Sequence, residues 1–265
     1  MELLKFKNMS LLIKKEEPWV ILPESRYDIS DRKIDTFMDD SFSLYLRVKI
    51  FPETMEYNTE GFAFARSGKH SGLSFYKTKN NDNSNIDNIT LMWTYWFTDD
   101  TFVQFQYELE ELEANDFINV VVLNDYINSK IFTVYVNSKL IDTKEYVDKE
   151  KQSYRFGEMG GGGFYQFGNG NFQVEDIAMY LECEFDMCFL IKGLRSLNEM
   201  ENIANTYEEN LIEFLEELRV FKNETLYKKD LAFFLDFKQQ NRYKVWELTH
   251  NGNYLSKATL ENIYF

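Results

Sequence analysis

The sequence predicts an all-β fold, an antiparallel sandwich with one amphipathic helix near its carboxyl-terminal part. Apolar and polar residues alternate with period two in one segment after another, and polar turns separate these segments without intervening helices. A helical period begins only after Asp186. The chain has 265 residues, of which 44% are hydrophobic, and this is enough for one large sandwich with a substantial core.

The alternation is clearest in residues 41–50. The apolar face of this segment carries Phe42, Leu44, Leu46, Val48 and Ile50, and the polar face carries Ser43, Tyr45, Arg47 and Lys49. Further strands are predicted at 61–66 and 72–77, which form a hairpin, at 89–97 and 102–109, and on both sides of a polar turn at 124–129. The acidic stretch 108–113 reads as a solvated turn. This antiparallel series is typical of a β-sandwich.

The helix is predicted from a capping box and an apolar stripe. Ser196 and Glu199 have the spacing of the box. Apolar residues then recur at helical spacing, at Met200, Ile203, Ala204, Tyr207, Leu211, Phe214, Leu215 and Leu218. They predict one helix of about six turns. Its stripe docks on the sandwich or, in the alternative, on a protein partner.

Sequence of β type returns near the carboxyl end, at 231–237, 243–248 and 254–260. We therefore divide the chain into a sandwich at 1–193, a docked helix at 194–224, and strands at 225–265 that complete the same sandwich. The alternative is that the last strands begin a second copy. Closure is favoured because an unpaired edge of this hydrophobicity promotes aggregation.

Three motifs occur in an order that is typical of one superfamily. Residues 135–138 resemble a strand that ends in a Tyr-Val-Asn-Gly turn, with Ser138 in place of glycine. Residues 172–177 approximate a late Phe-x-Gly-x-Ile-Asp strand, and 194–200 approximate a helix start of the type Leu-Ser-x-Glu-Glu-Ile. On these motifs, residues 42–220 resemble the laminin-G-like, concanavalin A-like lectin and glucanase superfamily, which implies a jelly-roll (concanavalin A-like) sandwich. The opening-strand motif departs from that order, because its best match, 232–253, comes last.

The composition disfavours several classes of partner. The net charge of -15 opposes binding to nucleic acid or to an anionic membrane surface, since both need clustered cations. An 18-residue apolar run is absent from the sequence, so membrane insertion is not expected. Cys183 and Cys188 lie five apart in one predicted strand and should point to opposite faces as buried, reduced thiols. Without a secretory signal pattern, a cytoplasmic location fits best.

The candidate ligand-binding residues share the face that the alternation turns away from the core. They are Tyr45, Arg47, Trp96, Gln104, Gln106 and Tyr135, with Thr94 and Thr133 beside them. Aromatic rings stack on sugar rings, while amides and guanidinium groups hydrogen-bond hydroxyls. The competing interpretation is that this face packs against the second sheet or the helix.

Other chemistry is less well supported. Calcium is a candidate ligand for two loops that are rich in carboxylate and amide oxygens. The candidate residues are Asp82, Asn83 and Asp87 in one loop and Asp99 and Asp100 in the other. The alternative is that these residues only form turns, in which Asp and Asn are common. Glu182 and Glu184 share a strand face, as a glycosidase pair would. His70 and His250 have no recognisable nucleophile beside them, and the glycine run 160–163 lacks the residues that follow in a phosphate loop.

Together these observations favour a non-catalytic carbohydrate-recognition module that binds a glycan. An accessory domain of a larger bacterial glycosyltransferase for surface polysaccharide is one setting for it, by fold analogy alone. The alternatives are a scaffold that binds protein partners through the helix, and a divergent glycoside hydrolase that uses Glu182 and Glu184.

Overall fold

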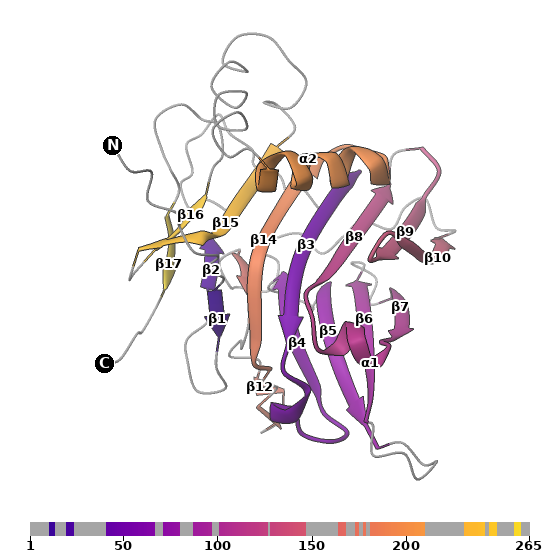
Figure 1. Cartoon of the computed structure of the whole chain (residues 1–265). Helices are drawn as coiled ribbons and strands as arrows, with labels where there is room; N and C mark the ends of the chain where they lie inside the picture. Colours follow the sequence, from indigo (N-terminus) through magenta and orange to yellow (C-terminus); the bar gives the residue numbers. More distant parts are fainter. Residues whose placement is uncertain are drawn as a thin grey trace.

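Across the residues that it describes, the computed structural model is mainly β, with fifteen strands joined in one antiparallel sheet (Figure 1). Along the sheet the strand order is β10-β9-β8-β3-β14-β15-β16-β17-β2-β11-β4-β5-β6-β7, and β1 pairs with β14 beside this path. β12 and β13 form a separate pair. The structure describes residues 11–13, 20–23, 41–66, 71–79, 87–96, 101–126, 128–146, 164–167, 173–174, 177–178, 181–209, 231–241, 244–247 and 257–260.

Most strands follow the predicted series, but the strands at 11–13, 20–23 and 164–167 were not predicted. In chain order they are β1 (Leu11–Ile13), β2 (Val20–Pro23), β3 (Phe42–Ile50), β4 (Glu60–Arg66), β5 (Ser71–Thr78), β6 (Asn88–Trp96), β7 (Phe102–Glu108), β8 (Ile118–Asp125), β9 (Ile131–Val136), β10 (Lys139–Glu145), β11 (Phe164–Phe167), β12 (Gln173–Val174), β13 (Ile177–Ala178), β14 (Cys183–Lys192), β15 (Leu231–Asn241), β16 (Lys244–Glu247) and β17 (Lys257–Leu260). The helical elements are η2 (Pro52–Thr54), α1 (Glu111–Ala114) and α2 (Leu197–Glu209). In the described part of the chain, no helix is long and apolar enough to cross a membrane.

The sheet folds over into two facing layers, which confirms the all-β sandwich. We call β9, β8, β3, β14 and β15 the β3 layer, and β4, β5, β6 and β7 the β6 layer; Figure 1 shows β14, β3 and β8 side by side. One apolar core cluster takes side chains from both layers. The core face predicted for 41–50 is confirmed, because alternate residues from Phe42 to Ile50 all belong to this cluster. The last strands join the same sheet, since β15 pairs with β14 and β17 with β2.

Buried aromatic rings connect the two layers. Phe42 of β3, Tyr95 of β6 and Phe132 of β9 meet with ring centroids 4.7 to 6.2 Å apart. Within the β6 layer, Trp93 stacks on Phe64 with centroids 6.3 Å apart. Rings of this size each remove a large apolar area from water, so these contacts are a major part of the core energy.

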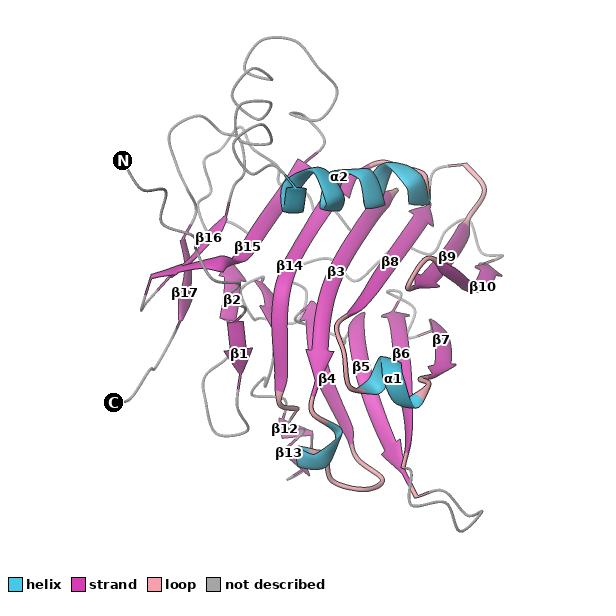
Figure 2. Cartoon of the chain, in the orientation of Figure 1, coloured by secondary structure: helices cyan, strands magenta, loops and turns pink. Residues whose placement is uncertain are grey.

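Helix α2 crosses the outer face of the β3 layer, over β14, β3 and β8 (Figure 2). Met200 and Ala204 are buried there against a second apolar cluster. The capping box is confirmed: the amide and hydroxyl of Ser196 donate to Oε2 of Glu199 at 2.8 Å, and the Glu199 amide donates to Ser196 Oγ at 3.3 Å. The docked stripe is thus confirmed from Leu197 to Ala204 of a helix that extends to Glu209. The side chain of Tyr207 and the predicted residues from Leu211 to Leu218 lie outside the described residues.

The connection into α2 is held by hydrogen bonds to β3. Gly193 adopts a positive φ of 84°, a conformation that favours glycine. Its amide donates to the oxygen of Ser41, and its own oxygen accepts from the Ser43 hydroxyl at 3.0 Å. The amide of Arg195 then donates to Ser43 Oγ at 2.8 Å. At the next turns of the helix, Ser138 in the β9–β10 turn donates to Glu201.

A β-bulge in β14 overturns the prediction for the two cysteines. Phe185 lies opposite Val48 and Met187 opposite Arg47, so Asp186 is an extra residue in β14. The bulge shifts the alternation by one residue, and both Cys183 and Cys188 therefore lie in the core. The prediction that the two cysteines point to opposite faces was wrong, but the prediction that both are buried free thiols is confirmed. Burial raises the pKa of both thiols, which disfavours the reactive thiolate.

The acidic stretch 108–113 is more ordered than a solvated turn. Glu110 and Glu113 form a capping box that starts the short helix α1. Glu113 also accepts from the Tyr107 hydroxyl at 2.9 Å and from Nδ2 of Asn137 at 3.1 Å. The predicted turn is therefore corrected to a helical turn whose carboxylates hold neighbouring strands.

We expect Ser196→Ala to weaken the docking of α2. The substitution removes the hydroxyl that takes part in two of the three bonds of the capping box, while the bond from the Ser196 amide to Glu199 can remain. The loss of such a cap costs about 1 kcal/mol. Urea unfolding followed by circular dichroism measures the change. Asn202→Ala, an exposed change within the same helix, is the control. An unchanged midpoint in Ser196→Ala would contradict the stabilising role of the box.

Candidate functional site

The predicted ligand residues do not share one face. Tyr45, Arg47 and Tyr135 lie on the β3 layer, whereas Gln104 and Gln106 lie on the β6 layer. Each of these side chains faces away from the common core, but the outer surfaces of two facing layers point in opposite directions. The prediction of one shared face is therefore corrected to two separate groups.

The group on the β3 layer is engaged in packing. The ring of Tyr45 stacks on Phe189 with centroids 5.0 Å apart and an interplanar angle of 8°. Only 3% of Tyr45 is exposed, because both rings belong to the cluster beneath α2. Tyr135 packs at the border of the same cluster. The alternative interpretation, that this face packs against the helix, holds for these two residues.

Arg47 lies beyond the helix and forms an ion pair at the bulge. Its Nη1 is 3.2 Å from Oδ2 of Asp186, whose side chain is 6% exposed against 28% for Arg47. The guanidinium also lies 5.4 Å from the ring centroid of Phe117. A carboxylate that is so deeply buried requires a cationic partner. Arg47 therefore compensates the negative charge of Asp186, which the bulge directs toward the outer face of the β3 layer.

The group on the β6 layer forms a connected polar ladder. Nε2 of Gln106 donates to Oε1 of Gln104 at 2.8 Å, and Nε2 of Gln104 donates to the Thr94 hydroxyl at 3.1 Å. Gln104 and Thr94 are also direct cross-strand partners in β7 and β6. Thr94 is buried, Gln104 half-buried and Gln106 exposed, so the ladder runs from the sheet surface to solvent.

An exposed ring continues this ladder and was missed as a candidate. Phe102, at the start of β7, is 49% exposed. Its spacing with Gln104, Gln106 and Glu108 follows period two, so these four residues share one strand face. That periodicity was a sufficient signal. We call Phe102, Gln104, Gln106 and Glu108 the β7 row. Trp96 pairs with Phe102 across the hairpin, but its side chain lies outside the described residues.

The remainder of this outer face is closed toward β4 and β5. Phe62, Ser74 and Met92 lie on it, and all three are buried. The Ser74 hydroxyl donates to Oε1 of Glu60. Solvent therefore reaches the face mainly along β7, at the end of the sheet.

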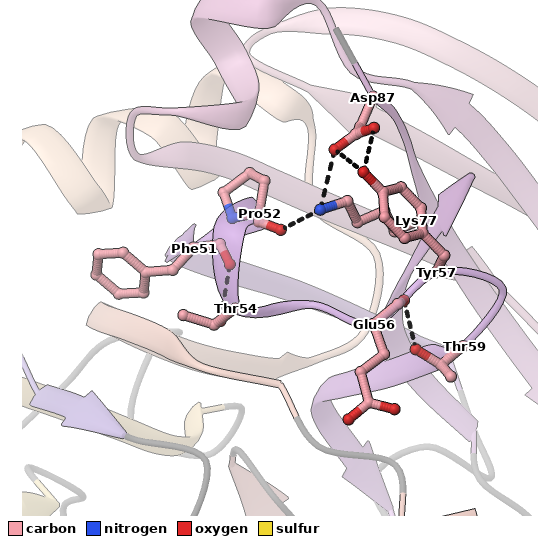
Figure 3. Close-up of polar contacts among 8 residues, drawn as sticks. All are labelled: Phe51, Pro52, Thr54, Glu56, Tyr57, Thr59, Lys77 and Asp87. Atoms are coloured by element: carbon pink, nitrogen blue, oxygen red, sulfur yellow. Dashed lines mark hydrogen bonds and ion pairs between the residues drawn. The ribbon is translucent and has the colours of Figure 1, made fainter. Parts of the chain in front are cut away.

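Asp87 is engaged by protein groups at the end of the sandwich that Figure 3 shows. The Tyr57 hydroxyl donates to its carboxylate at 2.8 Å, and Nζ of Lys77 lies 3.0 Å from it. Lys77 also donates to the oxygen of Pro52 at 2.8 Å. Burial tends to raise the pKa of Asp87, but the hydrogen bonds from Lys77 and Tyr57 outweigh this effect and lower it. The ammonium group occupies the position that a cation would take.

Several other predicted residues lie outside the described residues. They are Asp82, Asn83, Asp99, Asp100, His70, His250 and the glycine run 160–163. Within the described ranges, no group of three His, Cys, Asp or Glu side chains could hold a metal ion. Calcium binding thus stays a prediction. Glu184 lies opposite Lys49 in the β3–β14 ladder, and the hydrolase alternative built on it and Glu182 also stays a prediction.

No protein-family model and no curated protein matches the sequence. Solved structures that are similar to this chain include three from botulinum neurotoxins. They are the binding domain of neurotoxin DC in complex with SialylT (12% identity, TM-score 0.46), the serotype D binding domain (13%, 0.47), and a structure of neurotoxin type C, a toxin whose cell entry depends on interaction with two ganglioside molecules (13%, 0.46). The matches cover 71%, 80% and 71% of this chain, in the same order. They cover 39%, 45% and 39% of the neurotoxin chains, so this chain spans less than half the length of each. A likeness this slight supports no inference about function.

We expect Asp186→Ala to destabilise the fold. The substitution leaves the partly buried Arg47 without this carboxylate, and because Arg47 keeps some solvent contact the cost should be about 1–3 kcal/mol. Urea unfolding measures it. Asp142→Ala, which removes an exposed partner of Lys144 at 3.7 Å, is the control and should cost less than about 1 kcal/mol. Equal effects of the two changes would show that burial at the bulge is unimportant.

We expect Asp87→Asn to lower stability in a pH-dependent way. The pKa of Asp87 is lower in the folded protein than in the unfolded chain, so its stabilising contribution is complete above about pH 4 and is lost as the pH falls further. The free energy of unfolding of the wild type should therefore be larger than that of the variant at pH 7, and the difference between them should be smaller at pH 3. Urea unfolding at both values checks this, with Glu53→Gln, an exposed carboxylate in η2 beside the Pro52 oxygen that binds Lys77, as the control. A difference that grows on acidification would refute the assignment.

Proposed function

We propose that the chain is a non-catalytic carbohydrate-recognition module, and that the β7 row is its sugar-binding surface. The observation that carries the proposal is the ladder from Gln106 through Gln104 to Thr94. It holds two amides in fixed orientations on an open strand. We also propose that the sandwich is a concanavalin A-like jelly roll, on the motifs in 135–138 and 194–200.

The chemistry of the β7 row suits sugar hydroxyls. A hydroxyl both donates and accepts, and an amide offers two N–H donors and an oxygen with two lone pairs. In the ladder each glutamine uses one donor, so Oε1 of Gln106 can still accept and each Nε2 has a second N–H. The half-exposed ring of Phe102 offers an apolar surface beside them. Because the ladder already restricts both amides, less side-chain entropy is lost on binding.

The proposal keeps part of the predicted residue set. Gln104, Gln106 and Trp96 remain candidates for sugar contact, and Phe102 joins them. Tyr45 and Tyr135 pack beneath α2, and Arg47 compensates Asp186, so we assign these three a structural role. The glycosyltransferase setting, the cytoplasmic location and the protein scaffold stay predictions.

A glycan array tests the proposal. Wild type should bind at least one glycan, and Phe102→Ala and the double change Gln104→Ala with Gln106→Ala should each weaken binding about tenfold or more. That loss corresponds to about 1.4 kcal/mol, the scale of one or two hydrogen bonds or a ring contact. The matched controls are Leu112→Ala, an exposed apolar residue on α1, and Asn198→Ala, an exposed amide on α2.

Two results would overturn the proposal. One is the absence of binding to every glycan by folded wild-type protein. The other is binding that survives both β7-row variants unchanged, which would move the site elsewhere. Thermal unfolding of each variant confirms that the fold is retained, and this is expected because the substituted side chains are exposed or half-buried.

A further inference from the structure

We infer that the ligand of the β7 row is a linear, uncharged oligosaccharide that lies along β7. The inference rests on the proposed function and specifies its class of ligand. It depends on three properties of the site: the length of the row, the width of the open surface, and the charges around it.

The length of the row favours a chain of sugars over a single sugar. Phe102, Gln104, Gln106 and Glu108 lie on one strand face, with neighbours two residues apart. A strand rises about 3.4 Å per residue, so neighbouring side chains stand about 7 Å apart and the row extends about 20 Å. A monosaccharide contacts one or two of these side chains. An oligosaccharide parallel to β7 can contact all four.

The width of the open surface favours a linear chain. β7 is the last strand in the sheet order, so the face ends there on one side. On the other side the face is closed, because Ser74 and Phe62 are buried although they point away from the core. The open part is therefore a strip about one or two strands wide, and strands lie about 4.8 Å apart. A branch would extend beyond it.

The charges around the row favour an uncharged ligand. Glu108 ends the row, and Glu113 and the exposed Asp142 lie on neighbouring elements. The described cations nearby are already engaged. Lys144 donates to the main-chain oxygen of Gln104 and lies 3.7 Å from Asp142, and Lys139 lies over the ring of Tyr107 at 5.2 Å. With a net charge of -15 on the whole chain, a carboxylated or sulfated glycan would be repelled.

The test compares ligand length and charge by titration calorimetry. The probes are neutral gluco-, manno-, xylo- and galacto-oligosaccharides of one to six units, and uronic acid oligosaccharides of equal length. In the neutral series that binds, affinity should rise at least tenfold from one unit to four. The uronic acid series should bind at least tenfold more weakly, and the gap should narrow in high salt because salt screens the repulsion.

Two variants separate the charge effect from general damage. Glu108→Gln should improve binding of the uronic acid series, because it removes the carboxylate at the end of the row. Glu111→Gln, an exposed carboxylate on α1, is the matched control and should change neither series. If Glu108→Gln leaves uronic acid binding unchanged, the charge argument is overturned.

The outcomes also distinguish the inference from the proposed function. A monosaccharide that binds as tightly as the tetrasaccharide, or a uronic acid series that binds more tightly than the neutral one, overturns the inference and leaves the sugar-binding proposal standing. If none of these probes binds and the glycan array is also negative, the proposed function fails, and the inference fails with it.

Discussion

The contact between the two layers of the sandwich is the interaction on which the rest of the structure depends. Phe42, Tyr95 and Phe132 come from three strands that are distant in sequence, and their rings meet in the core. Once these layers are joined, every second residue of β3 and β7 must face outward. The polar ladder on β7 is therefore a product of core packing on the opposite side of the same strand.

The two outer faces have different roles because different elements cover them. On the β3 layer, α2 buries a stacked pair of rings, and Arg47 compensates the carboxylate of Asp186. This face contributes mainly to stability. On the β6 layer, the row along β7 remains open to solvent and carries amides in a fixed arrangement. Candidate binding residues are thus concentrated where the sheet has no covering helix among the described residues.

The residue pattern within single elements predicted the faces of strands and the start of the helix. The faces of β3 and β7 follow from simple alternation, and the capping box at Ser196 follows from residue types three apart. Alternation failed in β14, because an extra residue at Asp186 shifts the faces and leaves no mark in composition. It could not show that Tyr45 is buried, since that depends on where α2 docks. Neither the Lys77 contact to Asp87 nor the division into two faces has a local signal, because each depends on tertiary pairing.

The lysine at position 144 has a further consequence for assembly. Open sheets expose rows of unpaired main-chain groups at their last strands, and such rows recruit strands of other molecules. Here the ends of the sheet, β10 and β7, come to lie beside each other, and the ammonium of Lys144 covers the Gln104 carbonyl that a foreign strand would need. The bond from Lys144 removes one acceptor that an added strand would need, and this disfavours edge-to-edge pairing at β7. A ligand of β7 is therefore expected to contact the outward-facing side chains rather than the main chain at Gln104.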